Sequence, residues 1–124
     1  ETSSHAGGPI YHSDVMMYIG TELAVVCEDA ITNGKSNVIE SLGKTHELMF
    51  ISHSQLLNFC GNCIEVKDDQ NRLCLVMSSK AIAGYDDSQK KVLNHFYDRI
   101  IHSDLETIES HGGGSARCMI MELY

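Results

Sequence analysis

The order of the predicted strands and helices is the feature that most constrains how this chain folds. Two apolar, strand-like segments precede a helical segment and a further strand, and a similar order recurs later in the chain. A strand–strand–helix–strand unit of about 40–50 residues cannot bury its apolar face alone, so such units pack against one another. The sequence therefore predicts an α+β protein with a loosely repeated unit of this kind, although its self-similarity is too weak to establish a repeat.

The first unit is defined by turn residues that separate its apolar segments. Glycine and asparagine interrupt these segments where the chain must reverse, and Gly43 stands where a helix would end. The predicted elements are a strand at Ile10–Ile19, a turn at 20–22, a buried strand at Leu23–Ile31, a helix with Val38, Ile39 and Leu42 on its apolar face, and a strand at His46–Ser52.

The second unit begins with a short helix that Ser52 or Ser54 is suited to cap and that Gly61 would end. An acidic segment at Asp86–Ser88 predicts the start of another helix, because carboxylates stabilise helix N-termini. The other predicted elements are strands at Cys63–Lys67 and Arg72–Ser78 around a hairpin turn at 68–71, a helix face at Val92, Leu93, Phe96, Tyr97 and Ile100, and strands at Leu105–Glu109 and Ala116–Tyr124.

Length and composition indicate one globular domain. The chain has 124 residues, of which 43% are hydrophobic, which excludes wholesale disorder. Residues 1–8 are small and polar and predict a flexible lead-in, which leaves residues 9–124 as the domain. No apolar run approaches the roughly 18 residues that a membrane-spanning helix needs, so we expect no membrane span.

Charge and cysteine content exclude further classes of protein. Nine basic side chains against 17 acidic ones, a net charge of −8, do not provide the basic face that nucleic-acid binding requires. The odd number of cysteines, five, argues against a fully paired secreted scaffold. We therefore expect an intracellular protein in a reducing compartment, the cytoplasm or an organelle interior.

A glycine run near the end of the chain is the first candidate for chemistry. Residues 112–114 are three consecutive glycines, which allow positive φ angles and close approach of a ligand. Cys118 follows directly after Arg117, whose positive charge favours a thiolate. A reactive cysteine and a buried structural cysteine in a strand are equally supported by these residue types alone.

Two other segments carry polar groups of possible function. On the predicted first strand His12 and Asp14 would point to the same side, where a proton-transfer group and a cation-binding carboxylate can share one cleft. Taken alone, this segment favours the alternative of a histidine satisfied at a strand end beside a surface aspartate. Cys60 and Cys63 form a Cys-x-x-Cys pair around Asn62, but no second pair accompanies it. Structural thiols are the favoured interpretation, and we expect no metal and no cofactor.

Four segments together resemble the arginine deiminase-related branch of the guanidino-group-modifying enzymes, which includes the dimethylarginine dimethylaminohydrolases. They follow one another in that family's order and extend over nearly the whole chain. The segments are Pro-Ile-Tyr-His-Ser-Asp-Val-Met-Met at 9–17, Ile-Ser-His-Ser-Gln with Phe-Cys-Gly-Asn between 51 and 62, Met-Ser-Ser-Lys-Ala at 77–81 and Gly-Gly-Gly-Ser-Ala-Arg-Cys-Met at 112–119.

The resemblance implies a pentein fold, a propeller of ββαβ modules around a central active site. Because enzymes of that family are longer, the chain would supply the C-terminal portion, about two modules and part of a third, and another protein segment or chain would complete the fold. The alternative that remains open is a non-catalytic, pentein-derived structural or partner-binding subunit of a larger assembly.

The resemblance also implies the role of each candidate residue. Cys118 would attack the guanidinium carbon of arginine or a substituted arginine, and His12 would be the general acid and base that leads to a citrulline-type product. Asp14 would hold the planar cation through paired hydrogen bonds. The other predicted substrate-binding residues are Arg117, Gly113, Gly114 and Asn62.

Overall fold

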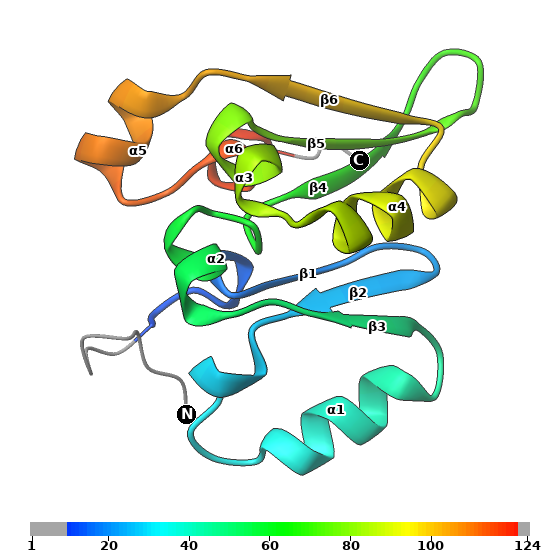
Figure 1. Ribbon diagram of the computed structural model, residues 1–124, viewed down its shortest axis with the longest axis vertical. Helices are drawn as coiled ribbons and strands as arrows, with labels where there is room; N and C mark the ends of the chain where they lie inside the picture. The colour runs from blue at the N-terminus through cyan, green and yellow to red at the C-terminus, as the bar shows by residue number, and fades with distance from the viewer. Residues whose placement is uncertain (1–9, 122–124) are drawn as a thin grey trace.

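Two three-stranded sheets form the framework of the protein (Figure 1). The computed structural model describes residues 10–121, so the predicted lead-in at 1–8 and the last three residues lie outside the described part. In Figure 1 the sheets lie one above the other, with α4 between them and α1 on the far side of the first sheet. None of the helices in the described part has the length and apolar character needed to cross a membrane.

The first sheet contains strands β1 (Met17–Ile19), β2 (Leu23–Val26) and β3 (Glu47–Phe50) in that order. β1 and β2 form an antiparallel hairpin, whereas β3 returns parallel to β2 after helix α1 (Lys35–Gly43). All four residues of β2 are buried, as expected for a central strand. The predicted hairpin, helix and third strand are therefore confirmed.

The second sheet repeats this topology with strands β4 (Ile64–Lys67), β5 (Leu73–Ser78) and β6 (Arg99–Ser103). β4 and β5 are antiparallel, and β6 is parallel to β5. Two helices lie in the crossover, α3 (Ser79–Gly84) and α4 (Asp87–Phe96). Two ββαβ modules are thus present, which confirms the α+β class and the pentein-type unit predicted from the sequence.

The two modules share one hydrophobic core and are joined by hydrogen bonds between them. Helix α2 (His53–Leu57) connects the modules and starts at Ser52, whose hydroxyl accepts the Gln55 N–H in a capping box. The Gln55 side chain donates to Gln89 of α4, and Gln89 donates to the Phe50 carbonyl of β3. The Glu65 carboxylate of β4 accepts the backbone N–H of Thr21 in the β1–β2 turn. The modules therefore hold each other in a fixed orientation.

The segment after α4 differs from the prediction. The predicted helix face included Tyr97 and Ile100, but α4 ends at Phe96 and Ile100 lies in β6. The Asp98 N–H donates to the Leu73 carbonyl, and the Asp98 carboxylate accepts the Leu73 N–H, which starts the pairing of β6 with β5. Pairing with a distant strand thus overrides the helical spacing of the apolar residues.

Three predicted strands are also corrected. Residues 106–109 belong to helix α5 (Glu106–Gly112), which Leu105 precedes as N-cap residue, and the predicted last strand begins instead with helix α6 (Ala116–Met119). The first predicted strand is shorter than expected, because Ser13–Val15 form the 3-10 turn η1 and only Met17–Ile19 pair with β2. In each of these segments the backbone N–H and C=O groups make hydrogen bonds with side chains or within turns. The spacing of apolar residues along the sequence does not reveal such bonds.

The N-cap of α4 predicts a pH-dependent contribution to stability. Hydrogen bonds from the Ser88 hydroxyl and the Gln89 N–H lower the pKa of Asp86 below its ordinary value. A lowered pKa means that this stabilisation is present above about pH 4, the unfolded value, and is lost as the pH falls through the folded value. In Asp86→Asn the cap remains but no longer titrates.

Thermal unfolding at several pH values checks this expectation. Asp86→Ala should lower the melting temperature by a few degrees at pH 7. The difference in melting temperature between the wild type and Asp86→Asn should shrink as the pH is lowered from 5 to 3. A difference that does not change with pH would show that the Asp86 carboxylate does not contribute in this way.

Candidate active site

A thiol, a carboxylate and an amide from three distant segments of the chain meet in this structure. Cys118 lies in α6, Asn62 in the loop before β4, and Asp14 in η1. The Cys118 Sγ accepts a hydrogen bond from Asn62 Nδ2 at 3.1 Å, and as a thiol it donates to Asp14 Oδ2 at 3.6 Å. The structure therefore brings together three residues that the sequence singled out separately.

Asn62 is the residue that connects these segments, and it is fully buried. Besides the sulfur, its Nδ2 donates to the Asp14 carbonyl at 2.8 Å, while its Oδ1 accepts the backbone N–H groups of Ser115 and Arg117 at 3.1 Å each. An amide side chain offers two donors and an oxygen with two lone pairs, so all four positions are used. Both η1 and α6 are thereby held against the loop that precedes β4.

Gly61 allows this arrangement because the η1 backbone lies directly against it. A Cβ atom at position 61 would lie 2.7 Å from the Met16 carbonyl carbon and 2.8 Å from the Val15 carbonyl oxygen. Real Cβ atoms are not found so close to backbone atoms, so any side chain would push the two segments apart. The predicted role of Gly61 as a helix end is wrong, because α2 ends at Leu57 and Gly61 serves this contact instead.

The glycine run shapes the segment that leads to the thiol. Gly113 has φ +68°, a conformation that favours glycine, and it ends α5. At Gly114 a Cβ atom would lie 2.8 Å from the Cys118 Sγ, so a side chain there would cover or displace the sulfur. The predicted positive φ is confirmed at Gly113, and the close approach at Gly114 is to the thiol itself.

The Asp14 carboxylate has one oxygen at the thiol and one that has no partner in the described part of the chain. Asp14 Oδ1 is buried and makes no hydrogen bond with the residues at 10–121. A buried carboxylate oxygen without a partner is unfavourable, so a donor that enters the site would be stabilised there. A planar cation with several N–H groups has the geometry to donate to both carboxylate oxygens.

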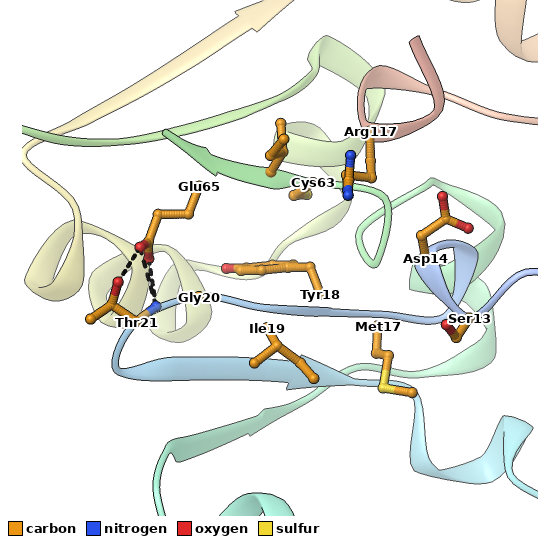
Figure 2. Close-up of a pocket in the computed structure, with 11 residues that line it drawn as sticks. Ser13, Asp14, Met17, Tyr18, Ile19, Gly20, Thr21, Cys63, Glu65 and Arg117 are labelled. Atoms are coloured by element: carbon orange, nitrogen blue, oxygen red, sulfur yellow. Dashed lines mark hydrogen bonds between the residues drawn. The ribbon is translucent and has the colours of Figure 1, made fainter. Parts of the chain in front are cut away.

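A cleft of about 440 Å³ extends from Asp14 along β1, between the two modules. Figure 2 shows Asp14 and Arg117 towards one end, Glu65 with Thr21 at the other, and Tyr18 between them. Arg117 Nη1 donates to the Ile120 carbonyl at 3.2 Å. Burial, next to Tyr97, raises the pKa of Tyr18 well above its ordinary value, so its hydroxyl stays neutral.

Cys118 is exposed, whereas the other four cysteines are buried, and all five are unpaired thiols. Burial raises the pKa of Cys60 to about 12 and also raises the pKa of Cys63. The Cys60 and Cys63 thiols donate to the carbonyls of Ala81 and Cys60. Within residues 10–121 no three His, Cys, Asp or Glu side chains come together as metal ligands. Both thiols lie in the hydrophobic core, and their structural role stays a prediction.

His12 is exposed and precedes η1, where its carbonyl oxygen accepts the Val15 N–H. The prediction that His12 and Asp14 share one face of a strand is wrong, because both precede β1 and Asp14 reaches the thiol from a 3-10 turn. The catalytic role of His12 remains a prediction. Ser115 and Glu109, which the sequence analysis did not predict as site residues, lie next to this site. The Ser115 hydroxyl donates to the buried Glu109 carboxylate at 2.6 Å.

Comparison with known proteins gives the family of the chain. The family described as N,N dimethylarginine dimethylhydrolase, eukaryotic, matches residues 1–124. The chain belongs to this family. No curated protein matches it. Membership confirms the dimethylarginine hydrolase-like branch of the pentein enzymes that the sequence motifs resemble, whose substrates are small arginine derivatives.

The contact at Gly61 predicts that its substitution separates the segments of the site. In Gly61→Ala the added methyl group must displace the η1 backbone, which should lower the free energy of unfolding by about 1–3 kcal/mol. Displacement of η1 should also break the contact between Asp14 and Cys118. Unfolding in urea measures the first effect, and the alkylation rate of Cys118 by iodoacetamide measures the second.

Gly43→Ala is the matched control for this variant. A Cβ atom at Gly43 would make an ordinary contact with Leu48 at 3.5 Å, and α1 lies away from the site. We expect Gly43→Ala to leave the alkylation rate unchanged. Equal effects of the two substitutions would contradict the proposed role of Gly61.

Proposed function

We propose that this protein hydrolyses the guanidinium C–N bond of arginine or a methylated arginine through a covalent intermediate on Cys118. The observation that carries this proposal is the Asp14 carboxylate, which contacts the thiol through Oδ2 and has a buried Oδ1 with no hydrogen-bond partner among the described residues. A guanidinium group that donates to this carboxylate is brought next to the sulfur. The family's description supports a dimethylated arginine as substrate.

The reaction is proposed in two steps. The Cys118 thiolate attacks the guanidinium carbon and forms a C–S bond. One C–N bond then breaks, and its nitrogen takes a proton from His12 and leaves as ammonia or an alkylamine. Water next attacks the thiouronium carbon while His12 accepts its proton, the C–S bond breaks, and the thiolate and a ureido product of the citrulline type are released.

The surroundings of the sulfur support its role as the nucleophile. Cys118 is the exposed thiol among the five, and the Asn62 N–H directed at its sulfur is a donor that stabilises a developing thiolate. Asp14 is the proposed partner of the substrate cation. Arg117 lines the adjoining cleft and, with Gly113, Gly114 and Asn62, remains a predicted part of the substrate-binding site.

A non-catalytic, partner-binding role is the second candidate function. Several large apolar side chains are exposed on the described part of the protein, among them Tyr11 at 85% and Met121 at 81%. Where such side chains form one contiguous patch, the patch is typical of sites that another protein segment or chain covers. Such a partner is equally compatible with the first proposal, in which it would complete the pentein fold around the active site.

The five unpaired thiols also bear on the location of the protein. Disulfides form and persist in oxidising compartments, whereas free thiols persist where glutathione and thioredoxin keep them reduced. We therefore propose an intracellular, reducing compartment.

Substitution of the nucleophile and the carboxylate tests the proposed reaction. Cys118→Ala should abolish formation of the ureido product from dimethylarginine, with a loss of roughly a thousandfold or more. Asp14→Asn, which removes the charge but keeps the shape, should lower kcat/KM by roughly a hundredfold. Colorimetric detection of the ureido product measures both effects.

Asp29→Asn is the control, since Asp29 is exposed, pairs with Lys35 and is not among the residues that line the cleft. Its turnover should match the wild type. If Cys118→Ala retained wild-type turnover, covalent catalysis by this thiol would be excluded. A stable complex with another protein and no turnover of any guanidine would instead favour the partner-binding role.

A further inference from the structure

Glu109 is a buried carboxylate that the proposed reaction does not use. It lies on α5, only 8% of its surface is exposed, and it accepts the hydroxyl of Ser115 at 2.6 Å. Ser115 is itself fully buried. A hydrogen bond to an ionised acceptor at this distance is stronger than one between neutral groups, and carboxylates are rarely buried without a partner.

This contact continues to the thiol through two further bonds. The Ser115 N–H donates to Asn62 Oδ1, and Asn62 Nδ2 donates to the Cys118 Sγ. The Ser115 carbonyl also accepts the Cys118 N–H at 3.0 Å, which closes the turn that carries the sulfur. Ser115 is thus fixed at its side chain by Glu109 and at its backbone by Asn62 and Cys118.

The need for such an anchor follows from the residues that precede Ser115. The glycine run at 112–114 has more backbone freedom than other residues, and within residues 10–121 it belongs to no strand. The position of the turn that begins at Ser115 is therefore not determined by the glycines. A hydrogen bond to the adjacent helix supplies the missing constraint.

We propose that Glu109 is a positioning residue that holds Ser115, and through it Asn62, so that the Asn62 N–H stays directed at the Cys118 sulfur. This role rests on the proposed function of Cys118 as nucleophile. Because Glu109 lies behind Ser115 and not in the cleft beside Asp14, its loss should affect turnover and not binding of the substrate cation.

Three substitutions and one control test the proposal in the whole protein. Glu109→Leu and Ser115→Ala remove the contact from its two ends, and Glu109→Gln keeps an oxygen that can accept the Ser115 hydroxyl. Glu106→Gln is the matched control, since Glu106 is exposed on the same helix. Thermal unfolding identifies any variant that does not fold. If Glu109→Leu does not fold, Glu109→Gln and Ser115→Ala are compared with the wild type instead.

Two measurements are made on these variants. In kinetics with dimethylarginine, Glu109→Leu and Ser115→Ala should lower kcat by roughly tenfold or more with little change in KM, and Glu109→Gln should recover most of the loss. In NMR spectra of the 15N-labelled protein, the side-chain amide signals of Asn62 should shift in Glu109→Leu and Ser115→Ala. Neither readout should change in Glu106→Gln.

The two readouts separate failure of this proposal from failure of the proposed function. Unchanged Asn62 signals, or equal kcat for Glu109→Leu and Glu106→Gln in a protein that needs Cys118 for turnover, would overturn the positioning role. An equal rise in KM for Glu109→Leu and Asp14→Asn would also overturn it, because it would place Glu109 at the substrate. If the wild type has no turnover, the proposed function fails, and the Asn62 signals alone then decide whether Glu109 holds the turn.

Discussion

The side-chain amide of Asn62 is the interaction on which the candidate site depends. It makes four hydrogen bonds, to Asp14, Cys118, Ser115 and Arg117, and so joins the start of the first module to the end of the described chain. The residues it joins are as many as 56 positions away in sequence. Its loss would remove the acceptor of the buried Ser115 N–H, and a buried group that loses its partner costs about 1–3 kcal/mol.

The packing of the two ββαβ modules against each other brings the Asn62 amide within hydrogen-bonding distance of its partners. A shared hydrophobic core holds the sheets together, and the absence of a side chain at Gly61 lets the η1 backbone approach the loop before β4. The cleft that results is lined by residues of both modules and ends at Asp14. Fold and site are therefore linked through one close backbone contact.

Local signals explain which parts of the fold were predictable from the sequence. Both hairpins, α1 and the capped starts of α2 and α4 depend on neighbouring residues, such as Ser52 and Asp86, and the sequence identified them. β6 was missed because Ile100 continues the helical spacing of α4, while its actual partner is the distant strand β5.

In the candidate site, too, individual residues were predictable from the sequence whereas the contacts between distant segments were not. Short motifs singled out Cys118, Asp14 and Asn62, and the structure brings these three side chains together. The contacts themselves were not predictable, since α6 is capped by an amide 53 positions upstream of Ser115, and Glu109 gives no local signal.

The most direct test of the account is the mass of the Cys118 peptide after the protein is mixed with dimethylarginine and quenched in acid during turnover. We predict a mass increase on Cys118 equal to that of the substrate without its dimethylamine, whereas product formation with an unmodified Cys118 and a modification elsewhere would contradict the account.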